Sequence, residues 1–306
     1  MVDFSSAPSR FSVLDPANLG RLEALESINS DDIIAARMAR FKALWATFDP
    51  PNAATYDVGQ LEFDPIKIQA ENNAYFETLL RDRVNQAVRA VTLAFAFGSN
   101  LEGLASNYPG GVPRIAGESD DRYRRRIWSS PNPLSPHGTA EGYEFWGLTA
   151  LATLRDVRTV KIRPSLSDNP IVVIACLADA VDPSPSQSDL LAVRAFIMEE
   201  SRLAMTDEIS VSPPKIIDTN YVVRVDLFPG PDKDTMMAQL RANIDALIEK
   251  QRWLGYDHTR AAIDAALMVS GVHNVSVIEP AEDIMVRNDW FVRVNSVDLQ
   301  YGGRAE

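Results

Sequence analysis

Residues 110–154 read GGVPRIAGESDDRYRRRIWSSPNPLSPHGTAEGYEFWGLTALATL, and this stretch carries the clearest local structural signals in the chain. Pro113 fixes its own φ and keeps the preceding residue out of the helical region, so the segment begins extended. Ser119 is a good N-cap for a helix whose first turn holds Asp120 and Asp121, where the helix dipole favours acidic side chains. The stretch therefore predicts a turn followed by a short, charged helix.

The remainder of the stretch predicts a stiff connection and a second helix. Residues 129–139, SSPNPLSPHGT, contain three prolines and a glycine, a composition typical of a rigid, extended linker. Thr139 caps the following helix and Glu141 stands in its first turn. The apolar bulk of this helix comes from Tyr143, Phe145, Trp146, Leu148 and Leu151.

These segments together resemble one known family. GVPRIAGESDDRYRRRI at 111–127, GTAEGYEFWGLTA at 138–150 and a strand that opens at Asp156-Val157 are similar to the baseplate J-like proteins of contractile-tailed phages and related particles. The family pattern is a G-E-S-D-x-x-[FY]-R-x-R-[IL] helix, a Gly-x-x-x-x-Tyr helix and a D-V strand. The match is close over the middle of the chain. No single position identifies the family, but the run of motifs taken together is specific for it.

The resemblance implies a structural protein of a virion tail baseplate. Such proteins form wedges that ring the central hub, so the implied partners are further copies of the chain and other wedge proteins, with the hub and sheath-proximal proteins as neighbours. No cofactor is implied. The implied function is mechanical, because repacking of interfaces between copies would transmit the trigger for sheath contraction.

Length and composition set wider limits. With 306 residues the chain exceeds the usual single domain, and its 46% hydrophobic content is that of a folded protein. A net charge of −12 argues against electrostatic nucleic-acid binding and favours solubility. The N-terminal MVDFSSAPSRF does not fit a signal peptide, and no apolar stretch approaches the ~20 residues that span a bilayer. We expect a protein made in a host cytoplasm and assembled into a virion, without membrane partners.

The N-terminal region predicts helices. Apolar spacing between Leu19 and Phe48 indicates two of them, the second capped at Ser30, and residues 49–52 (DPPN) end that helix before a loop to Phe63. Asp64-Pro65 then starts a helix with no breaking residue before Gly98. One apolar stripe follows that helix: Ile66, Ala70, Asn73, Phe76, Leu80, Val84, Val88, Val91 and Phe95.

This predicted helix is unusually long for the region that contains it. Its 33 residues would extend roughly 50 Å. Its last segment, AVTLAFAFG, is apolar almost all round and requires burial on more than one side. Partner subunits are the natural source of that cover. The alternative is a backbone helix packed wholly against its own domain.

The second half of the chain changes to strand-like patterns. Residues 156–164, 170–178, 208–213, 219–228, 273–280 and 289–301 read as strands, and 189–202, 232–253 and 260–270 read as helices. The order is ββαβ followed by βααββ, which predicts two small α+β units in tandem, each a sheet with helices on one face. No internal repeat is strong enough to identify them as copies.

We therefore predict an α+β fold: a helical N-terminal half with one very long helix, followed by two tandem α+β domains. The predicted domains are an N-terminal helical segment at 1–63, a long-helix core-bundle region at 64–155, and α+β domains at 156–214 and 215–306.

Histidine and cysteine residues give no support for a metal or nucleophile site. His137, His258 and His273 have no second His or Cys at ligand spacing, so each is better explained by a turn or cap. Cys176 lies in the apolar run IVVIACLA, which predicts a buried small hydrophobe rather than a reactive thiol.

Charged clusters also have simpler explanations than catalysis. The pairs Asp31/Asp32 and Asp120/Asp121 fit first turns of helices, and Glu282/Asp283 fits a polar loop. The run Arg122, Arg124, Arg125 and Arg126 fits a solvated helix face paired to the acids before it, or an electrostatic contact to an acidic neighbouring subunit.

We expect no catalytic, cofactor-binding or metal-binding residues. Glycine-rich phosphate loops and common hydrolase motifs are missing from the sequence. Two alternatives to a wedge protein remain open: a tail-associated enzyme, such as a cell-wall hydrolase, and an adaptor that binds the tail tube or sheath. Hydrolysis by the purified protein would favour the first, and crosslinks to tube or sheath without self-contact would favour the second.

Overall fold

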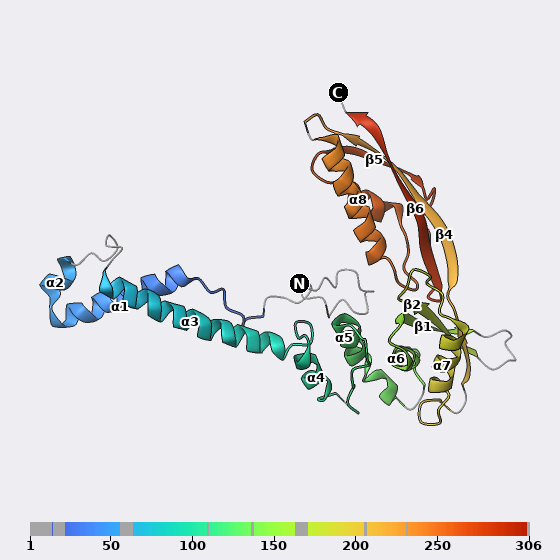
Figure 1. The fold of residues 1–306 in the computed structure, drawn as a ribbon, viewed down its shortest axis with the longest axis horizontal. Helices are drawn as coiled ribbons and strands as arrows, with labels where there is room; N and C mark the ends of the chain where they lie inside the picture. Colours follow the sequence, from blue (N-terminus) through green and yellow to red (C-terminus); the bar gives the residue numbers. More distant parts are fainter. Residues whose placement is uncertain are drawn as a thin grey trace. The chain divides into compact units, whose positions relative to one another are not determined.

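The computed structural model divides the chain into two compact units. One unit is Leu19–Asn100, and the other is Leu101–Glu306 together with Leu14 of the N-terminal segment. Figure 1 labels most of the helices and strands of both units. The structure describes residues 14, 22–55, 64–108, 110–135, 138–162, 171–204, 207–230 and 232–304.

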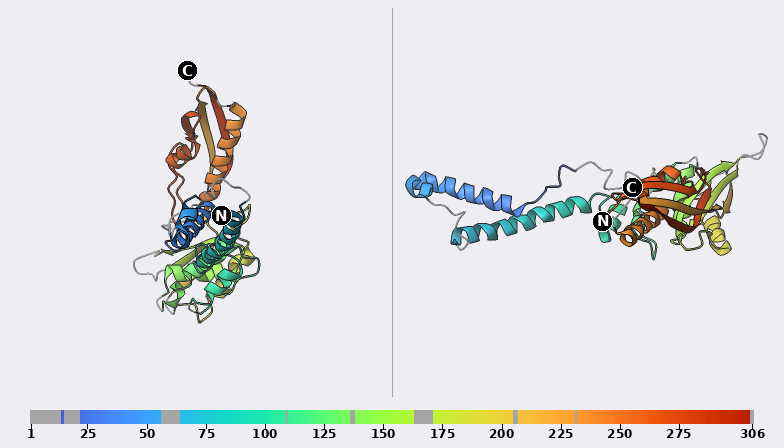
Figure 2. Two further views of the ribbon diagram at one scale, coloured as in Figure 1. Left: turned by 90° about the vertical axis from the view of Figure 1, so that its left-hand side faces the viewer. Right: turned by 90° about the horizontal axis from the view of Figure 1, so that it is seen from above.

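The described part of Leu19–Asn100 forms a helical hairpin. Its helices are α1 (Ser30–Phe48), α2 (Pro50–Thr55) and α3 (Pro65–Ala90). Asn29, rather than the predicted Ser30, caps α1, and Asp64 caps α3 by accepting a hydrogen bond from Ile66 N at 2.7 Å. The predicted start at Asp64-Pro65 is confirmed. The right-hand view of Figure 2 shows α1 running alongside α3.

The length predicted for this helix is wrong. α3 has 26 residues and ends at Ala90, and the apolar segment that follows forms turns. Two physical reasons contribute. Val91, Thr92 and the aromatic residues beyond them are weaker helix formers than the residues of α3. The Thr92 hydroxyl also donates to the Val88 carbonyl at 2.9 Å, a side-chain bond that competes with the helix ladder.

Two further predictions in this unit differ from the structure. Residues 22–29, placed in a first helix, form a turn and extended chain, because the side chain of Asn85 bonds both backbone groups of Glu26. Residues 50–55, predicted as a break and loop, form α2, since prolines are tolerated in the first turn of a helix. The start of the predicted first helix, 19–21, lies outside the described residues.

The unit from Leu101 opens with helices that match the sequence prediction closely. Ser119 and Thr139 cap α5 and α6 as predicted, each through its hydroxyl oxygen. Gly147 of α6 faces Val157 so closely that an added Cβ would lie 2.8 Å from that side chain, which explains the glycine at this position. The helices are α4 (Ser99–Ala105), not predicted, α5 (Asp120–Ser129) and α6 (Ala140–Ala150), with a short 3-10 helix at Asn132–Leu134.

The first sheet has three strands in the order β1-β2-β3. β1 pairs antiparallel with β2, and β2 pairs parallel with β3 after the chain crosses over through α7. Side chains of α6 and α7 share one hydrophobic core with this sheet. The bounds are β1 (Leu154–Ile162), β2 (Ile171–Ala178), α7 (Gln187–Ile197) and β3 (Glu208–Ser212).

The second sheet has the order β5-β4-β6, with β5 antiparallel and β6 parallel to the central strand. Alternate residues of β4 from Tyr221 to Leu227 face the buried side of α8, as the period of two requires. Figure 1 shows α8 covering one face of this sheet. The bounds are β4 (Lys215–Leu227), α8 (Lys233–Lys250), α9 (Arg260–Leu267), β5 (Val272–Glu279) and β6 (Trp290–Arg304).

The predicted α+β class is therefore confirmed: helices in the N-terminal half, then two small sheets, each packed against helices. The predicted element order ββαβ and βααββ is also confirmed. Helices α7, α8 and α9 end three to five residues earlier than predicted, and β4 begins four residues earlier. The four predicted domains stay a prediction.

Candidate functional site

The histidines and the cysteine occupy structural positions. His258 is buried, with its Nδ1 2.6 Å from the hydroxyl of Tyr221, and His273 stacks edge-on against Phe228. Burial raises the pKa of the Cys176 thiol to about 12, so the buried thiol is unreactive at neutral pH, as predicted. His137 lies outside the described residues. Within the described ranges, no three His, Cys, Asp or Glu side chains come together in a way that could hold a metal ion.

The carboxylate pairs fit the roles predicted for them. Asp31/Asp32 lie in the first turn of α1, and Asp120/Asp121 lie in the first turn of α5. Asp283 lies in the loop before β6, where its carboxylate accepts a hydrogen bond from the backbone N–H of Arg260 at 2.8 Å. These acids therefore stabilise helix starts and loops.

The arginine run of α5 is buried, and both interpretations of it as an exposed face are wrong. Arg122, Arg124, Arg125 and Arg126 are all buried, and the side chains of Arg124 and Arg126 are each only 1% exposed. One part of the prediction holds: Arg124 pairs at 2.9 Å with Asp121, one of the acids that precede the run. The run lies in the interior, so it is unavailable to an acidic neighbouring subunit.

Glu118 is the counter-ion that allows this burial. Its fully buried carboxylate lies 2.5 Å from Arg122 Nη1 and accepts two hydrogen bonds from Arg126, at 2.7 and 2.9 Å. Burial alone would raise the pKa of Glu118, but the hydrogen bonds and charges of Arg126 and Arg122 hold that pKa below its ordinary value. Glu118 stands in the quoted G-E-S-D segment, yet its role as a buried counter-ion was not predicted from that segment.

Arg122 uses its remaining donors to close the end of α6. Its guanidinium donates to the carbonyl oxygens of Leu148, Leu151 and Leu154, the last two at 2.5 and 2.8 Å. The last carbonyls of a helix have no partner within the helix, so a buried cation there satisfies them and complements the helix dipole. The family-like motif in α5 therefore has a structural role, because its Arg122 holds the end of α6 and the start of β1 in place.

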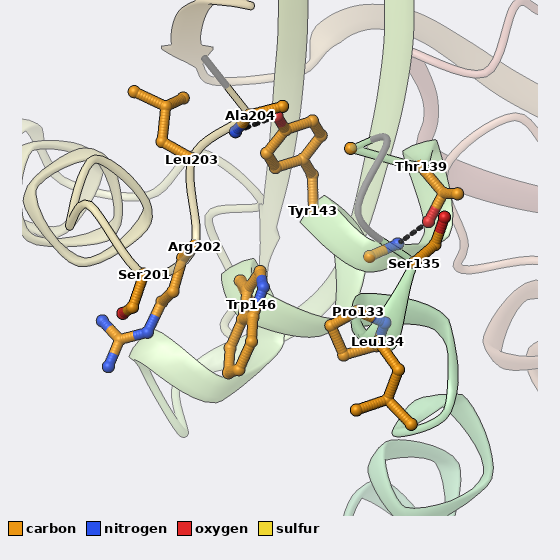
Figure 3. Close-up of a pocket in the computed structure, with 12 residues that line it drawn as sticks. Pro133, Leu134, Ser135, Thr139, Tyr143, Trp146, Ser201, Arg202, Leu203 and Ala204 are labelled. Carbon is orange, nitrogen blue, oxygen red and sulfur yellow. Dashed lines mark hydrogen bonds between the residues drawn. The ribbon is translucent and has the colours of Figure 1, made fainter.

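A pocket lies beside α6, and Figure 3 shows its lining. Its volume is about 160 Å³. The Tyr143 hydroxyl donates to Asp207 at 2.8 Å and accepts from Ala204 N at 3.2 Å, and burial raises its pKa to about 12. Arg202 stacks on Phe196, with its Cζ 3.6 Å from the ring centroid. These contacts hold Ala204 and Asp207 against Tyr143 of α6, and Arg202 against α7.

The helical hairpin has an unusual distribution of side chains. The seam between α1 and α3 has ion pairs beside buried apolar residues such as Ile33 and Ala74. Arg37 donates to Glu77 at 2.6 Å, and Glu77 also pairs with Arg81. Near the end of the seam, Asn85 Nδ2 donates to the Glu26 carbonyl at 2.9 Å and its Oδ1 accepts from Glu26 N at 3.0 Å. Small residues, Ala70 and Ala74, are the buried apolar side chains of α3.

Large apolar side chains of α3 point to solvent. Phe76, Leu80 and Val84 are 55, 69 and 59% exposed, and their spacing of four residues places them on one stripe. Ile68, Tyr75 and Leu79 form a second exposed stripe on the first half of the helix. We call these two sets the outer face of α3. The outer face is the candidate functional surface, since apolar side chains gathered on one helix mark interaction sites.

A pattern in the sequence pointed to part of this surface. The predicted stripe contained Phe76, Leu80 and Val84, and the expectation that the helix leaves apolar side chains uncovered is confirmed for the chain by itself. The seam residues Asn85 and Arg37 were not predicted, because hydrogen bonds between residues 40 or 59 positions apart leave no local signal. No helix in the described part of the chain combines the length and hydropathy that a membrane span requires.

Comparisons with known proteins agree on one class. A model of the Baseplate J-like N-terminal domain matches residues 62–116, which contain α3 and α4. The resemblance to baseplate J-like proteins is therefore confirmed.

One relative of this chain is baseplate protein J of Escherichia phage P2. It is 28% identical to this chain over 289 residues, which cover 90% of this chain and 93% of the relative. Among solved structures, a chain of the cryo-EM structure of the anti-feeding prophage baseplate matches with a TM-score of 0.40 and 18% identity. That match covers 62% of this chain and 43% of the other, so this chain spans less than half of that neighbour. The similarity to phage P2 baseplate protein J supports a structural role in a baseplate.

Proposed function

We propose that this chain is a wedge protein of a contractile tail baseplate, located in the virion, where copies of it surround the central hub. The outer face of α3 is the single observation that carries the proposal. In the isolated hairpin, water contacts the exposed side chains of Phe76, Leu80 and Val84. These side chains form an apolar surface on which another helix can pack. The similarity to baseplate protein J of phage P2 supports the setting.

The free energy expected from burying apolar side chains supports docking of a partner on the outer face. Full burial of a large apolar side chain contributes about 1.5–3 kcal/mol, so burying the exposed half of each contributes roughly 1 kcal/mol. Two stripes with several such residues provide enough to hold a partner helix when the partner is presented in a fixed orientation. The partly exposed ion pairs of the seam contribute much less.

The proposed partners follow from this chemistry. An apolar stripe with spacing of four residues accepts a helix from another wedge protein or a further copy, and two stripes accept two helices. The hub and sheath-proximal proteins are proposed as neighbours of the assembled ring. The acidic chain has no proposed nucleic-acid or membrane partner, and its role is mechanical rather than enzymatic.

The test changes the outer face without touching the seam. In particles that carry Leu80→Ser and Val84→Ser, we expect electron micrographs to show tails without assembled baseplates. The matched control, Glu71→Ser with Arg89→Ser, alters two exposed polar residues of the same helix and should leave baseplates intact. The purified double variant should keep the circular dichroism of the parent chain, because the changed side chains are exposed.

Normal baseplates in the Leu80→Ser, Val84→Ser particles would overturn the proposal. Hydrolysis of cell-wall material by the purified parent chain would instead favour the enzyme alternative. Crosslinks from the outer face to tube or sheath proteins alone would favour the adaptor alternative.

A further inference from the structure

The loop after α8 leaves its own sheet and contacts the other one. Leu254 is fully buried in a small apolar cluster with Ala175 and Leu177 of β2 and Phe291 of β6. The three partners of Leu254 come from both sheets. The loop at residues 251–255 therefore forms part of the joint between the two α+β halves, and we name it the joint loop.

Trp253 of the joint loop lies beside two cations of the first half. The Cζ atoms of Arg125 on α5 and Arg155 on β1 are 4.5 and 5.0 Å from the centroid of its ring. The side chain is buried, and its Nε1 has no hydrogen-bond partner within the described structure. Stacking on guanidinium groups and packing, rather than a polar bond, hold the indole in place.

Arg155 ties the same loop to the chain on both sides. Its Nε donates to the carbonyl of Arg252 at 2.8 Å, and its Nη2 lies 2.7 Å from the Glu249 carboxylate. Its Nη1 donates to Asp179, just after β2, at 3.1 Å. In return, Arg252 donates to the carbonyl of Ala180. Arg155 is mostly buried, so these bonds are screened less than those of an exposed pair.

The covalent connection between the halves is short by comparison. β3 ends at Ser212 and β4 begins at Lys215, with Pro213-Pro214 between them. Each proline fixes its own φ, so this linker is itself stiff and rotation between the sheets is confined to its two ends. The prolines also provide no side-chain hydrogen bonds that would fix how the sheets are oriented. The relative orientation of the two sheets therefore depends on the contacts of the joint loop.

We propose that the joint loop is a lock, in the sense that its contacts fix the orientation of the two sheets relative to each other. When those contacts are lost, the sheets rotate about the two ends of the Pro213-Pro214 linker. Trp253 and Leu254 supply the buried part of the lock, and Arg155 aligns the loop. The proposal concerns the C-terminal half alone and does not depend on the proposed baseplate role. A lever that moves as one body transmits a displacement from one of its ends to the other.

The test measures a distance between the halves in the full chain. Spin labels on Leu191→Cys of α7 and Met268→Cys after α9 report it, because both positions are exposed. The native Cys176 is buried and its thiol has a pKa of about 12, so labelling is confined to the introduced cysteines. We expect a narrow distance distribution in the parent chain. In Trp253→Ala and in Arg155→Ala we expect the width to at least double.

Trp128→Ala is the control, because it removes an exposed tryptophan of α5 outside the joint and should keep the narrow distribution. Circular dichroism identifies any variant that does not fold. If Trp253→Ala fails to fold, Arg155→Ala decides the question. Unchanged widths in the folded variants would show that the joint loop is not the lock.

Discussion

Glu118 is the residue on which the buried cations of α5 depend. One carboxylate balances Arg122 and Arg126, and those arginines in turn hold the end of α6 and the carbonyl of Pro113. A buried ion network of this kind adds little net stability over an apolar one, but losing one member leaves the others uncompensated. The network therefore makes the fold sensitive to single substitutions at Glu118.

Replacing Glu118 is expected to destabilise the unit from Leu101 strongly. Glu118→Gln leaves two buried guanidinium groups without a counter-charge, and we expect a loss of about 3–5 kcal/mol in the free energy of unfolding. Urea denaturation of the full chain measures the loss. The exposed Glu200→Gln serves as the control and should change stability by less than about 0.5 kcal/mol. Equal stability of the two variants would contradict a structural role for the network.

His258 is expected to make stability depend on pH. Burial lowers the pKa of its ring to about 4, against 6.5 for an ordinary histidine, with weaker opposing effects from the Gln251 backbone and Asp257. The unfolded chain thus takes up the proton at higher pH than the folded chain, and acid favours unfolding. Stability from this residue is complete above pH 6.5 and falls by about 3 kcal/mol as the pH approaches 4.

The measurement is urea denaturation near neutral pH and near pH 4, in the parent chain and in His258→Gln. Glutamine at this site cannot take up the proton. Between neutral pH and pH 4, the variant should therefore lose about 3 kcal/mol less free energy of unfolding than the parent chain. An identical pH dependence in both proteins would mean that other groups cause the acid sensitivity.

At the scale of elements, the seam of the hairpin depends on Asn85. Its buried amide forms both hydrogen bonds to the backbone of Glu26, so it joins α3 to the chain that leads into α1. Asn85→Ala leaves a backbone donor and acceptor without partners, which costs about 1–3 kcal/mol. We expect faster amide exchange at residues 24–28 and little change in the sheets. Asn72→Ala, on an exposed position of the same helix, should exchange like the parent.

At the scale of the molecule, the two compact units differ in how they are stabilised. The unit from Leu101 has continuous apolar cores, whereas the hairpin buries only a few apolar residues and exposes large apolar side chains of α3. Few buried apolar contacts indicate a low local free energy of opening. The isolated hairpin is therefore the weaker unit, and assembly should stabilise it.

Amide exchange compares the purified chain with the chain in assembled particles. We expect residues 75–90 of α3 to exchange much more slowly in the particle, because a docked helix covers the outer face, while the core strand β4 changes little. Equal exchange of α3 in both states would indicate that nothing covers the outer face on assembly.

The sequence by itself determined the α+β class, the order of the elements from α5 onward and the caps at Ser119 and Thr139, because period and capping are local properties. It also indicated the apolar stripe through Phe76, Leu80 and Val84. Only the tertiary structure decided that the arginines of α5 lie inside, that α3 ends at Ala90 and that Asn85 holds the seam. The buried arginines and the seam depend on contacts distant in sequence, with the end of α6 and with Glu26, and a charge is buried only where such partners are present. The end of α3 depends on a balance of helix propensity and a local side-chain bond, which the apolar spacing alone does not show.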